Sequence, residues 1–300
     1  MNQTAAESAI SGPLARVRAL PIWSGTVDPR PLGGGITNIN FVVEDGSRRY
    51  FVRVGEDIPV HGLMRFNELA AARAAAAVGL SPEVVYAAPG VMVTGFVEGR
   101  TWGPEDARDP ANLERIVALI RRCHREMPKH LRGPALMFWV FQVVRDYAAT
   151  LRAGDSRHVA ALPDLLSRAE KLEAAVGPVE IVLGHNDLLA ANFIDTGTRL
   201  WLIDWDYAGF NSPLFDLANL ASNNAYTPAL EGDLLAAYYG APADAALLRR
   251  FRAMACASLL RETMWSMVSE IHSALDFDFA AYTAENLARF EHAHRAFEEG

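Results

Sequence analysis

Short runs that alternate apolar and polar residues dominate the first hundred positions of the 300-residue chain. Alternation with a period of two is typical of strands that bury one face. We therefore expect four strands there, which span residues 41–44, 50–54, 84–86 and 91–94. Asp45-Gly46 predicts a hairpin turn between the first two, because this dipeptide suits the positive φ angles of tight turns.

Apolar residues recur at helical spacing over most of the remaining chain. An alanine-rich segment at 63–78 predicts one helix within the strand-rich part, and Gly79 ends it. Further helices are expected at 109–127, 137–151 and 162–176, followed by short catalytic strands and a helical tail from Asp216. The pattern predicts an α+β chain: an antiparallel sheet with one helix, then a larger and mostly helical part.

Composition narrows the class of protein. A hydrophobic share of 51% can supply one large domain or two lobes with real cores. The chain shows no signal-peptide pattern and no run near 18 apolar residues, so we expect a cytoplasmic protein without a membrane span. Cys123 and Cys256 lack partner spacing and are expected to be buried free thiols. A net charge of −8 disfavours nucleic-acid binding and is compatible with a cationic small substrate.

The candidate chemistry lies between residues 181 and 219. An apolar run delivers the segment His185-x-Asp187-x4-Asn192, and a hairpin then brings Asp204 back beside it. Phosphoryl transfer needs such a set: one Asp meets the substrate hydroxyl, while an Asn and an Asp hold Mg²⁺ on the phosphates. Asp206 follows two residues later and can contact a second metal. Because type, spacing and strand–loop–hairpin context agree, the segment predicts a phosphotransferase site.

The whole chain resembles the choline and ethanolamine kinases of the aminoglycoside phosphotransferase superfamily, which share the protein-kinase fold. The resemblance rests on three patterns, GG-x-TN, HND-x4-N…IDWDYAGFNSPLFDLAN and MWSMV-x2-I…DFDF-x2-Y. It implies a two-lobe fold with an N-lobe at residues 1–98 and a C-lobe at 99–300. It also implies ATP as co-substrate and Mg²⁺ as cofactor. A protein kinase is disfavoured, since an apolar helical run begins only ten residues after Asp204.

The resemblance assigns roles to single residues. Asp187 becomes the catalytic base and His185 the brace of its loop, while Asn192, Asp204 and Asp206 become metal ligands. Arg53 takes the place of the usual phosphate-binding lysine and is expected to pair with Glu68, since an arginine fork can bridge phosphate and carboxylate. The expected nucleotide-binding residues are Gly34, Gly35, Thr37, Asn38, Arg53, Glu68, Gly95, Phe96 and Val97.

Two late segments are expected to form the acceptor pocket. Trp265 and Tyr282 match aromatic positions that surround a quaternary ammonium in choline kinases, although core packing is the ordinary role of such aromatics. Glu262 stands where many choline kinases have a second tryptophan, and Asn223 lies in a segment that often carries an acid. The expected partner is therefore a small amino alcohol: choline, ethanolamine or a relative.

Other functions are compatible with the sequence. The chain could phosphorylate an aminoglycoside, thiamine or a homoserine-like amino alcohol, or it could be a catalytically silent nucleotide-binding regulator. His124, His130 and His158 show no metal-ligand spacing and are expected at the surface or as caps. The sequence leaves the oligomeric state open, a homodimer included.

Overall fold

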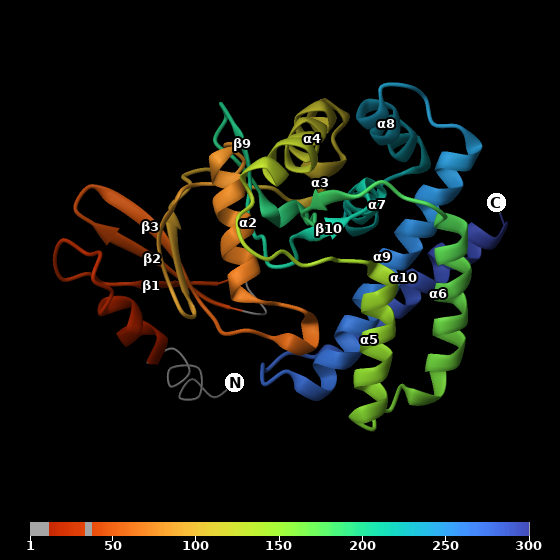
Figure 1. Ribbon diagram of the computed structural model, residues 1–300, viewed down its shortest axis with the longest axis horizontal. Helices are drawn as coiled ribbons and strands as arrows, with labels where there is room; N and C mark the ends of the chain where they lie inside the picture. Colours follow the sequence, from red (N-terminus) through yellow and green to blue (C-terminus); the bar gives the residue numbers. More distant parts are fainter. Residues whose placement is uncertain (1–11, 34–37, 300) are drawn as a thin grey trace.

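A five-stranded antiparallel sheet forms one end of the computed structural model, which describes residues 12–33 and 38–299 (Figure 1). The order across the sheet is β1-β2-β3-β5-β4; hairpins connect β2 to β3 and β4 to β5, while α2 and β4 lie between β3 and β5 in the chain. These strands are β1 (Arg30–Leu32), β2 (Ile39–Asp45), β3 (Arg48–Val54), β4 (Val84–Ala88) and β5 (Val91–Gly95).

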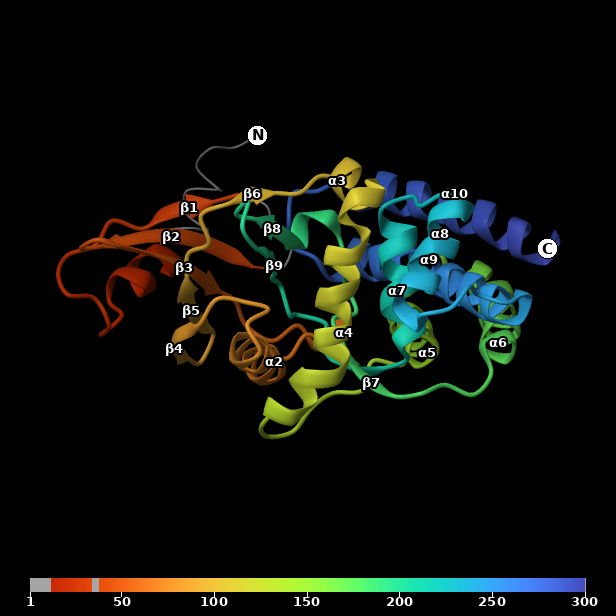
Figure 2. The same ribbon diagram turned by 90° about the horizontal axis from the view of Figure 1, so that it is seen from above.

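The β2–β3 hairpin follows the sequence pattern closely. Phe41 faces Val52 across the pair, and Gly46 in the predicted turn has a φ of +61°. Phe41, Val43 and Val52 are fully buried on one face of the sheet, where they pack with Val17. Helix α2 (Arg65–Ala77) lies beside β4, between the sheet and the helical part of the molecule (Figure 2). Its buried alanines pack into the large core of that second part.

Helices make up most of the remaining chain (Figure 1). Helix α9 is the central one, since it contacts α5, α6, α7 and α10. A helix surrounded in this way is apolar on most sides, as the residues of α9 are. The helices are α3 (Pro104–Arg108), α4 (Leu113–His130), α5 (Val140–Ala153), α6 (Leu162–Val176), α7 (Pro213–Asn223), α8 (Pro228–Tyr239), α9 (Ala245–His272) and α10 (Phe279–Glu299).

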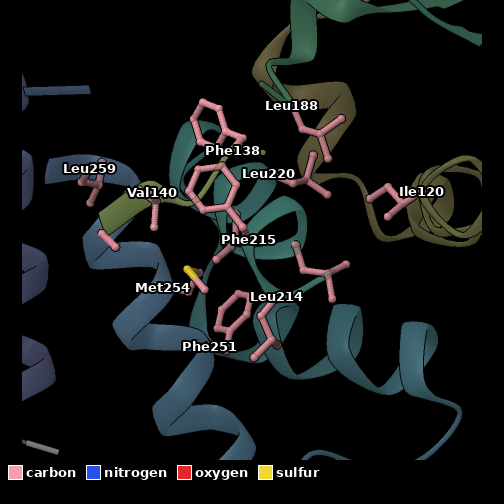
Figure 3. Packing of buried hydrophobic residues seen from close by; sticks show 14 of the residues in the cluster. Ile120, Phe138, Val140, Leu188, Leu214, Phe215, Leu220, Phe251, Met254 and Leu259 are labelled. Atoms are coloured by element: carbon pink, nitrogen blue, oxygen red, sulfur yellow. The ribbon is translucent and has the colours of Figure 1, made fainter. Parts of the chain in front are cut away.

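The core of this part is packed around α7 (Figure 3). Phe138 and Phe215 are both buried, with ring centroids 5.2 Å apart. Leu214 and Phe251 continue the same cluster from α7 and α9. Because α7 is anchored on both sides, polar residues along it can position the loop that it contacts.

Two small sheets carry the central loops. β7 (Val182–Gly184) pairs with β10 (Gly209–Asn211), and β8 (Phe193–Asp195) pairs with β9 (Leu200–Leu202) and with β6 (Arg100–Thr101). The chain from β7 to β8 passes through a 3-10 turn at Ala190–Asn192. These strands hold both ends of the loop that contains Asp187.

The fold class expected from the sequence is confirmed, while three helix starts were predicted too early. Leu63 pairs with Ile58, so α2 begins at Arg65 and not at residue 63. Met137 is extended, pairs with Phe210 and is 68% exposed, so α5 begins at Val140. Asp109 caps a separate 3-10 turn by accepting a hydrogen bond from the N–H of Ala111 at 2.9 Å, and α4 begins only at Leu113. The domain boundary between residues 98 and 99 stays a prediction. Cys123 and Cys256 are buried free thiols, as expected.

No helix in the described ranges combines the length and the apolar character that crossing a membrane requires.

Candidate active site

Asp216 fixes the loop that carries Asp187. Its carboxylate lies at the start of α7 and accepts hydrogen bonds from the backbone N–H groups of His185 and Asn186, at 2.8 and 2.7 Å. Asn186 has a φ of +65°, a conformation that Asn tolerates better than most residues. Its side-chain amide donates to the carbonyls of Tyr207 and Gly209. The loop is thus held from both sides by buried polar contacts.

His185 braces the same loop from inside, as the sequence predicted. Its Nδ1 accepts from the N–H of Asp187 at 3.3 Å, and its Nε2 donates to the carbonyl of Ile203 at 2.9 Å. Burial lowers the pKa of His185, which favours the neutral ring that these two bonds require.

His124 does not lie at the surface, so that expectation was wrong. It is buried, and its Nε2 lies 2.9 Å from Asp216 while its Nδ1 lies 2.7 Å from the hydroxyl of Tyr238. Burial alone would raise the pKa of Asp216, but the hydrogen bond and charge of His124 outweigh it and hold that pKa below its usual value. Of the other two, His130 is exposed and His158 is partly buried against Glu270.

Asp187 is the most perturbed carboxyl group of the loop. Burial raises its pKa to about 8, opposed by the positive charge of Arg261 and assisted by the negative charges of Glu262 and Asp204. A carboxyl group with a pKa near neutrality is matched to proton transfer at physiological pH. The side chain of Asn192 donates to the carbonyl of Asp187 at 2.8 Å, so the two residues are held in one arrangement.

Asp204 enters the site on a left-handed backbone, with a φ of +69°. This conformation is uncommon for residues other than glycine and is found where function demands it. Its carboxylate is 33% exposed and accepts from Nη1 of Arg53 at 3.0 Å. The hairpin between β8 and β9 places Asp204 beside Asn192, because the N–H of Ile203 bonds the carbonyl of Asn192 at 3.0 Å.

Arg53 and Glu68 form the pair that the sequence predicted. Nη1 of Arg53, on β3, donates to Oε1 of Glu68, on α2, at 2.6 Å. Both side chains are almost fully buried. Burial would lower the pKa of Arg53, but the charges of Asp204, Asp206 and Glu68 outweigh it and raise that pKa, so the guanidinium stays charged.

Asp206 joins this network more firmly than Asp204 does. Its Oδ1 accepts from Nη1 of Arg53 at 2.7 Å and from Nη1 of Arg65 at 2.9 Å, and its Oδ2 accepts from the amide of Asn38 at 3.1 Å. Arg65 also pairs with Glu68 at 2.7 Å. With both oxygens engaged by the sheet side of the molecule, Asp206 is less suited than Asp204 to bind a metal.

The predicted nucleotide segments border the same region. Gly34, Gly35 and Thr37 lie outside the described residues. The N–H groups of Gly95 and Phe96 donate to the carbonyls of Glu83 and Arg49, and Val97 follows them in the wall of the cavity described next.

A single cavity of about 690 Å³ collects these side chains. Its walls come from the sheet, the central loops and the late helices, which are far apart in sequence. The predicted site residues that line it are Asn38, Arg53, Glu68, Gly95, Phe96, Val97, Asp187, Asn192, Asp204, Asp206, Asn223, Glu262, Trp265 and Tyr282. A cavity between two structural parts is the usual place for a small-molecule site.

Trp265 and Tyr282 meet at the α9 and α10 end of this cavity. Their ring centroids are 6.4 Å apart at an interplanar angle of 88°. Nε1 of Trp265 donates to the hydroxyl of Tyr207 at 2.8 Å, and the hydroxyl of Tyr282 donates to Glu262 at 2.8 Å. His61 stacks on Trp265 at 4.9 Å, so one of its faces is covered.

The oxygen donors of this site suit a magnesium ion that is bound together with phosphates. Asn192 donates its amide nitrogen to Asp187, which leaves its amide oxygen for a cation, and Asp204 offers an exposed carboxylate. In the described parts of the chain no three His, Cys, Asp or Glu side chains cluster in a way that could hold a metal alone. Mg²⁺ commonly binds one or two protein oxygens together with substrate phosphates, so this set suits it.

The residues from 28 to 253 match the family model described as "Phosphotransferase enzyme family". The chain belongs to this family. Mouse ethanolamine kinase 2 is 30% identical over 91% of the chain and 78% of its own length. Protein LicA of Haemophilus influenzae is 29% identical over 62% of the chain, and the aligned segment spans 56% of LicA, about half of its length.

A solved structure gives the same assignment. A choline/ethanolamine kinase family protein from Mesorhizobium loti has 28% identity and a TM-score of 0.75, and the comparison covers 97% of this chain and 99% of that one. The fold is therefore kinase-like and the chain is choline/ethanolamine kinase-like, as the resemblance in the sequence indicated.

Proposed function

We propose that the protein transfers the γ-phosphate of ATP to the hydroxyl group of choline, ethanolamine or a related amino alcohol. The observation that carries this proposal is the shared cavity: Asp187, Asn192 and Asp204 line it together with Arg53 at one side and Trp265 at the other. A phosphate donor and an alcohol acceptor can therefore meet at Asp187.

In the proposed reaction, Arg53 binds phosphate oxygens while Glu68 and Asp206 hold its guanidinium in place. Asn192 and Asp204 hold Mg²⁺, which when bound neutralises charge on the phosphates. Asp187 orients the acceptor hydroxyl and takes its proton as the oxygen attacks the γ-phosphorus. Positioning and electrostatics supply most of the catalysis in such a reaction.

The aromatic rings at the acceptor end favour a small alcohol that carries one ammonium group over an aminoglycoside. Trp265 and Tyr282 line the same cavity as Asp187, whereas an aminoglycoside pocket would be more acidic and less aromatic. A catalytically silent regulator has no need for a carboxyl group whose pKa is raised to about 8 beside two oxygen ligands for a cation.

An acceptor screen tests the proposal. ADP formation is followed with Mg²⁺-ATP and, in turn, choline, ethanolamine, thiamine and an aminoglycoside. We expect saturable turnover with an amino alcohol and only background ATP hydrolysis with the other two. Preferred turnover of thiamine or the aminoglycoside would contradict the assignment of the acceptor, and no transfer to any alcohol would contradict the enzyme activity.

A further inference from the structure

Arg261 places a buried positive charge at the acceptor end of the cavity. It precedes Glu262 on α9, lines the cavity and is only 4% exposed. Its guanidinium stacks over the ring of Tyr207 at 4.2 Å and lies 5.6 Å from the ring of Phe138. It therefore occupies an aromatic face that a quaternary ammonium would otherwise use.

The hydrogen bonds of Arg261 are incomplete within the described part of the chain. Nη1 donates to Glu262 at 2.9 Å, while Nε and Nη2 are buried and have no partner among the described residues. The guanidinium interacts electrostatically with Tyr147 and Tyr207. Nε and Nη2 share one edge of the guanidinium, and that edge is the fork that binds a carboxylate through two parallel hydrogen bonds. Buried donors are rarely left unpaired without a ligand or water to meet them.

A second arginine lines the same end of the cavity. Arg289, on α10, is held by the carbonyl of Ser222 at 2.9 Å and the side chain of Asn286 at 3.1 Å. Glu262, which could face a cation, already accepts from Arg261 and from Tyr282. Asp187, the other carboxyl group near Arg261, also has that guanidinium as a positive neighbour. An acceptor that carries only positive charge therefore meets the repulsion of two arginines at this wall.

We propose that the preferred acceptor is zwitterionic and carries a carboxylate in addition to its ammonium and hydroxyl groups. This inference rests on the proposed function and narrows its acceptor. The carboxylate binds the free edge of Arg261, with Arg289 nearby, and the ammonium lies toward Glu262 and the rings of Trp265 and Tyr282. The chemical class is a hydroxylated amino acid.

The reaction balances in the same way as for an amino alcohol. The hydroxyl oxygen forms a bond to the γ-phosphorus of ATP, and the bond from that phosphorus to the β–γ bridging oxygen breaks. The hydroxyl proton passes to Asp187. The products are ADP and the phosphate monoester of the hydroxylated amino acid.

Matched acceptor pairs test the proposal with the wild-type protein. L-Serine differs from ethanolamine by one carboxylate, and L-homoserine differs from 3-amino-1-propanol in the same way. Two charge-assisted hydrogen bonds from Arg261 to the carboxylate are expected to raise kcat/KM. In the pair that is turned over faster, the carboxylated acceptor should exceed its uncarboxylated partner by roughly 10- to 100-fold. Higher kcat/KM for both uncarboxylated members would overturn the proposal.

Variants show whether Arg261 causes the preference. Arg261→Met is expected to bring the kcat/KM ratio within the pair close to one, and Arg261→Lys to leave an intermediate ratio. The ratio is the readout because Arg261 also acts on Asp187 and its loss slows every acceptor. Arg252→Met is the matched control, since Arg252 lies on the same helix, is 43% exposed and pairs with Glu231. An unchanged ratio in Arg261→Met would contradict the assignment.

The remaining outcomes separate the two proposals. Turnover of choline without turnover of any carboxylated acceptor overturns the zwitterionic class and leaves the proposed function standing. No phosphate monoester from any acceptor, choline included, overturns both. If Arg261→Met does not fold, the wild-type ratio alone decides.

Discussion

Asp204 shows how a single residue combines backbone and charge in this site. Its left-handed backbone turns the carboxylate toward Asn192 and the cavity, while Arg53 holds one of its oxygens at 3.0 Å. Asp206, two positions later, is buried and fully engaged by Arg53, Arg65 and Asn38. The two carboxylates thus have different environments. That of Asp204 is partly exposed, whereas that of Asp206 is buried.

The substitution Asp204→Asn removes the negative charge of the side chain and adds no backbone strain. Asparagine tolerates a positive φ, so the fold should be kept, whereas alanine would add strain. We expect transfer to fall to background and the Mg²⁺ concentration needed for half-maximal nucleotide binding to rise, because the main carboxylate ligand is lost. Titration of Mg²⁺ against nucleotide binding in both proteins measures this. An unchanged metal requirement would show that Asp204 is not a ligand.

At the scale of elements, α7 holds the central loop in place. Asp216 accepts two backbone N–H groups of the loop and bonds His124 from α4, so it connects three elements in a buried setting. Such a carboxylate costs free energy to bury and is stabilising only while its partners remain.

Asp216→Asn tests this connection. We expect the free energy of unfolding to fall by about 3 kcal/mol, since one buried charge is removed while His124 and two N–H donors remain. Denaturant unfolding measures the change. Asp164→Asn serves as the control, because Asp164 is 63% exposed and pairs with Arg168 at the surface. Equal small losses in the two variants would refute the role of Asp216.

His61 links the 3-10 turn at Pro59–His61 to α5 and α9. Its ring nitrogens lie 3.4 Å from the hydroxyl of Tyr147 and 3.1 Å from that of Ser269. Burial lowers the pKa of His61 to about 3, assisted by the positive charges of Arg261 and His272. Between about pH 3 and pH 6.5 the ring of His61 therefore stays neutral in the native state, while the same ring binds a proton in the unfolded chain.

The depressed pKa predicts a loss of stability in acid. Below pH 6.5 the imidazole of His61 binds a proton in the unfolded chain but not in the native state. The free energy of unfolding therefore falls by about 1.4 kcal/mol per pH unit until the pH approaches 3. His61→Gln lacks this titration, and its stability should fall less steeply between pH 6 and 4. Denaturant unfolding of both proteins at several pH values measures the difference. Parallel curves would contradict the prediction.

The sequence predicted local arrangements well and long-range partners poorly. The spacing of Asp187, Asn192 and Asp204 within one strand–loop–hairpin unit was visible because those residues are close along the chain. The partners of Asp216 and Arg261 come from distant helices, and no periodicity records which side chain meets which. His124 has the sequence context of an ordinary helical histidine, and only the packing of α4 against β7 brings it to Asp216.

At the scale of the whole molecule, one cavity joins the sheet to the late helices. Arg53 comes from β3 and Trp265 from α9, more than two hundred residues apart, and both line it with Asp187. The donor and acceptor ends can therefore be perturbed separately, although both depend on the same fold.

Trp265→Phe tests the acceptor end. The variant keeps an aromatic face but loses the hydrogen bond to Tyr207, so we expect the KM of the acceptor to rise about 10-fold while the KM of ATP stays unchanged. Stability should fall by about 1 kcal/mol. Trp139→Phe is the control, since Trp139 bonds Glu173 outside the cavity and should lose stability without a change in either KM. A purely structural Trp265 would behave as this control does.

In the proposed reaction, Asp187 directs the transfer of the phosphoryl group to the acceptor hydroxyl. The most direct measurement follows product formation by phosphorus NMR with Mg²⁺-ATP and the best acceptor, in the wild type and in Asp187→Asn. The wild type should yield ADP and a phosphate monoester in equal amounts, and the variant should be slower by about 10²–10⁴-fold with similar affinity for nucleotide. Release of inorganic phosphate in place of the monoester would contradict phosphoryl transfer to the acceptor, and near-normal turnover in Asp187→Asn would contradict the role of Asp187.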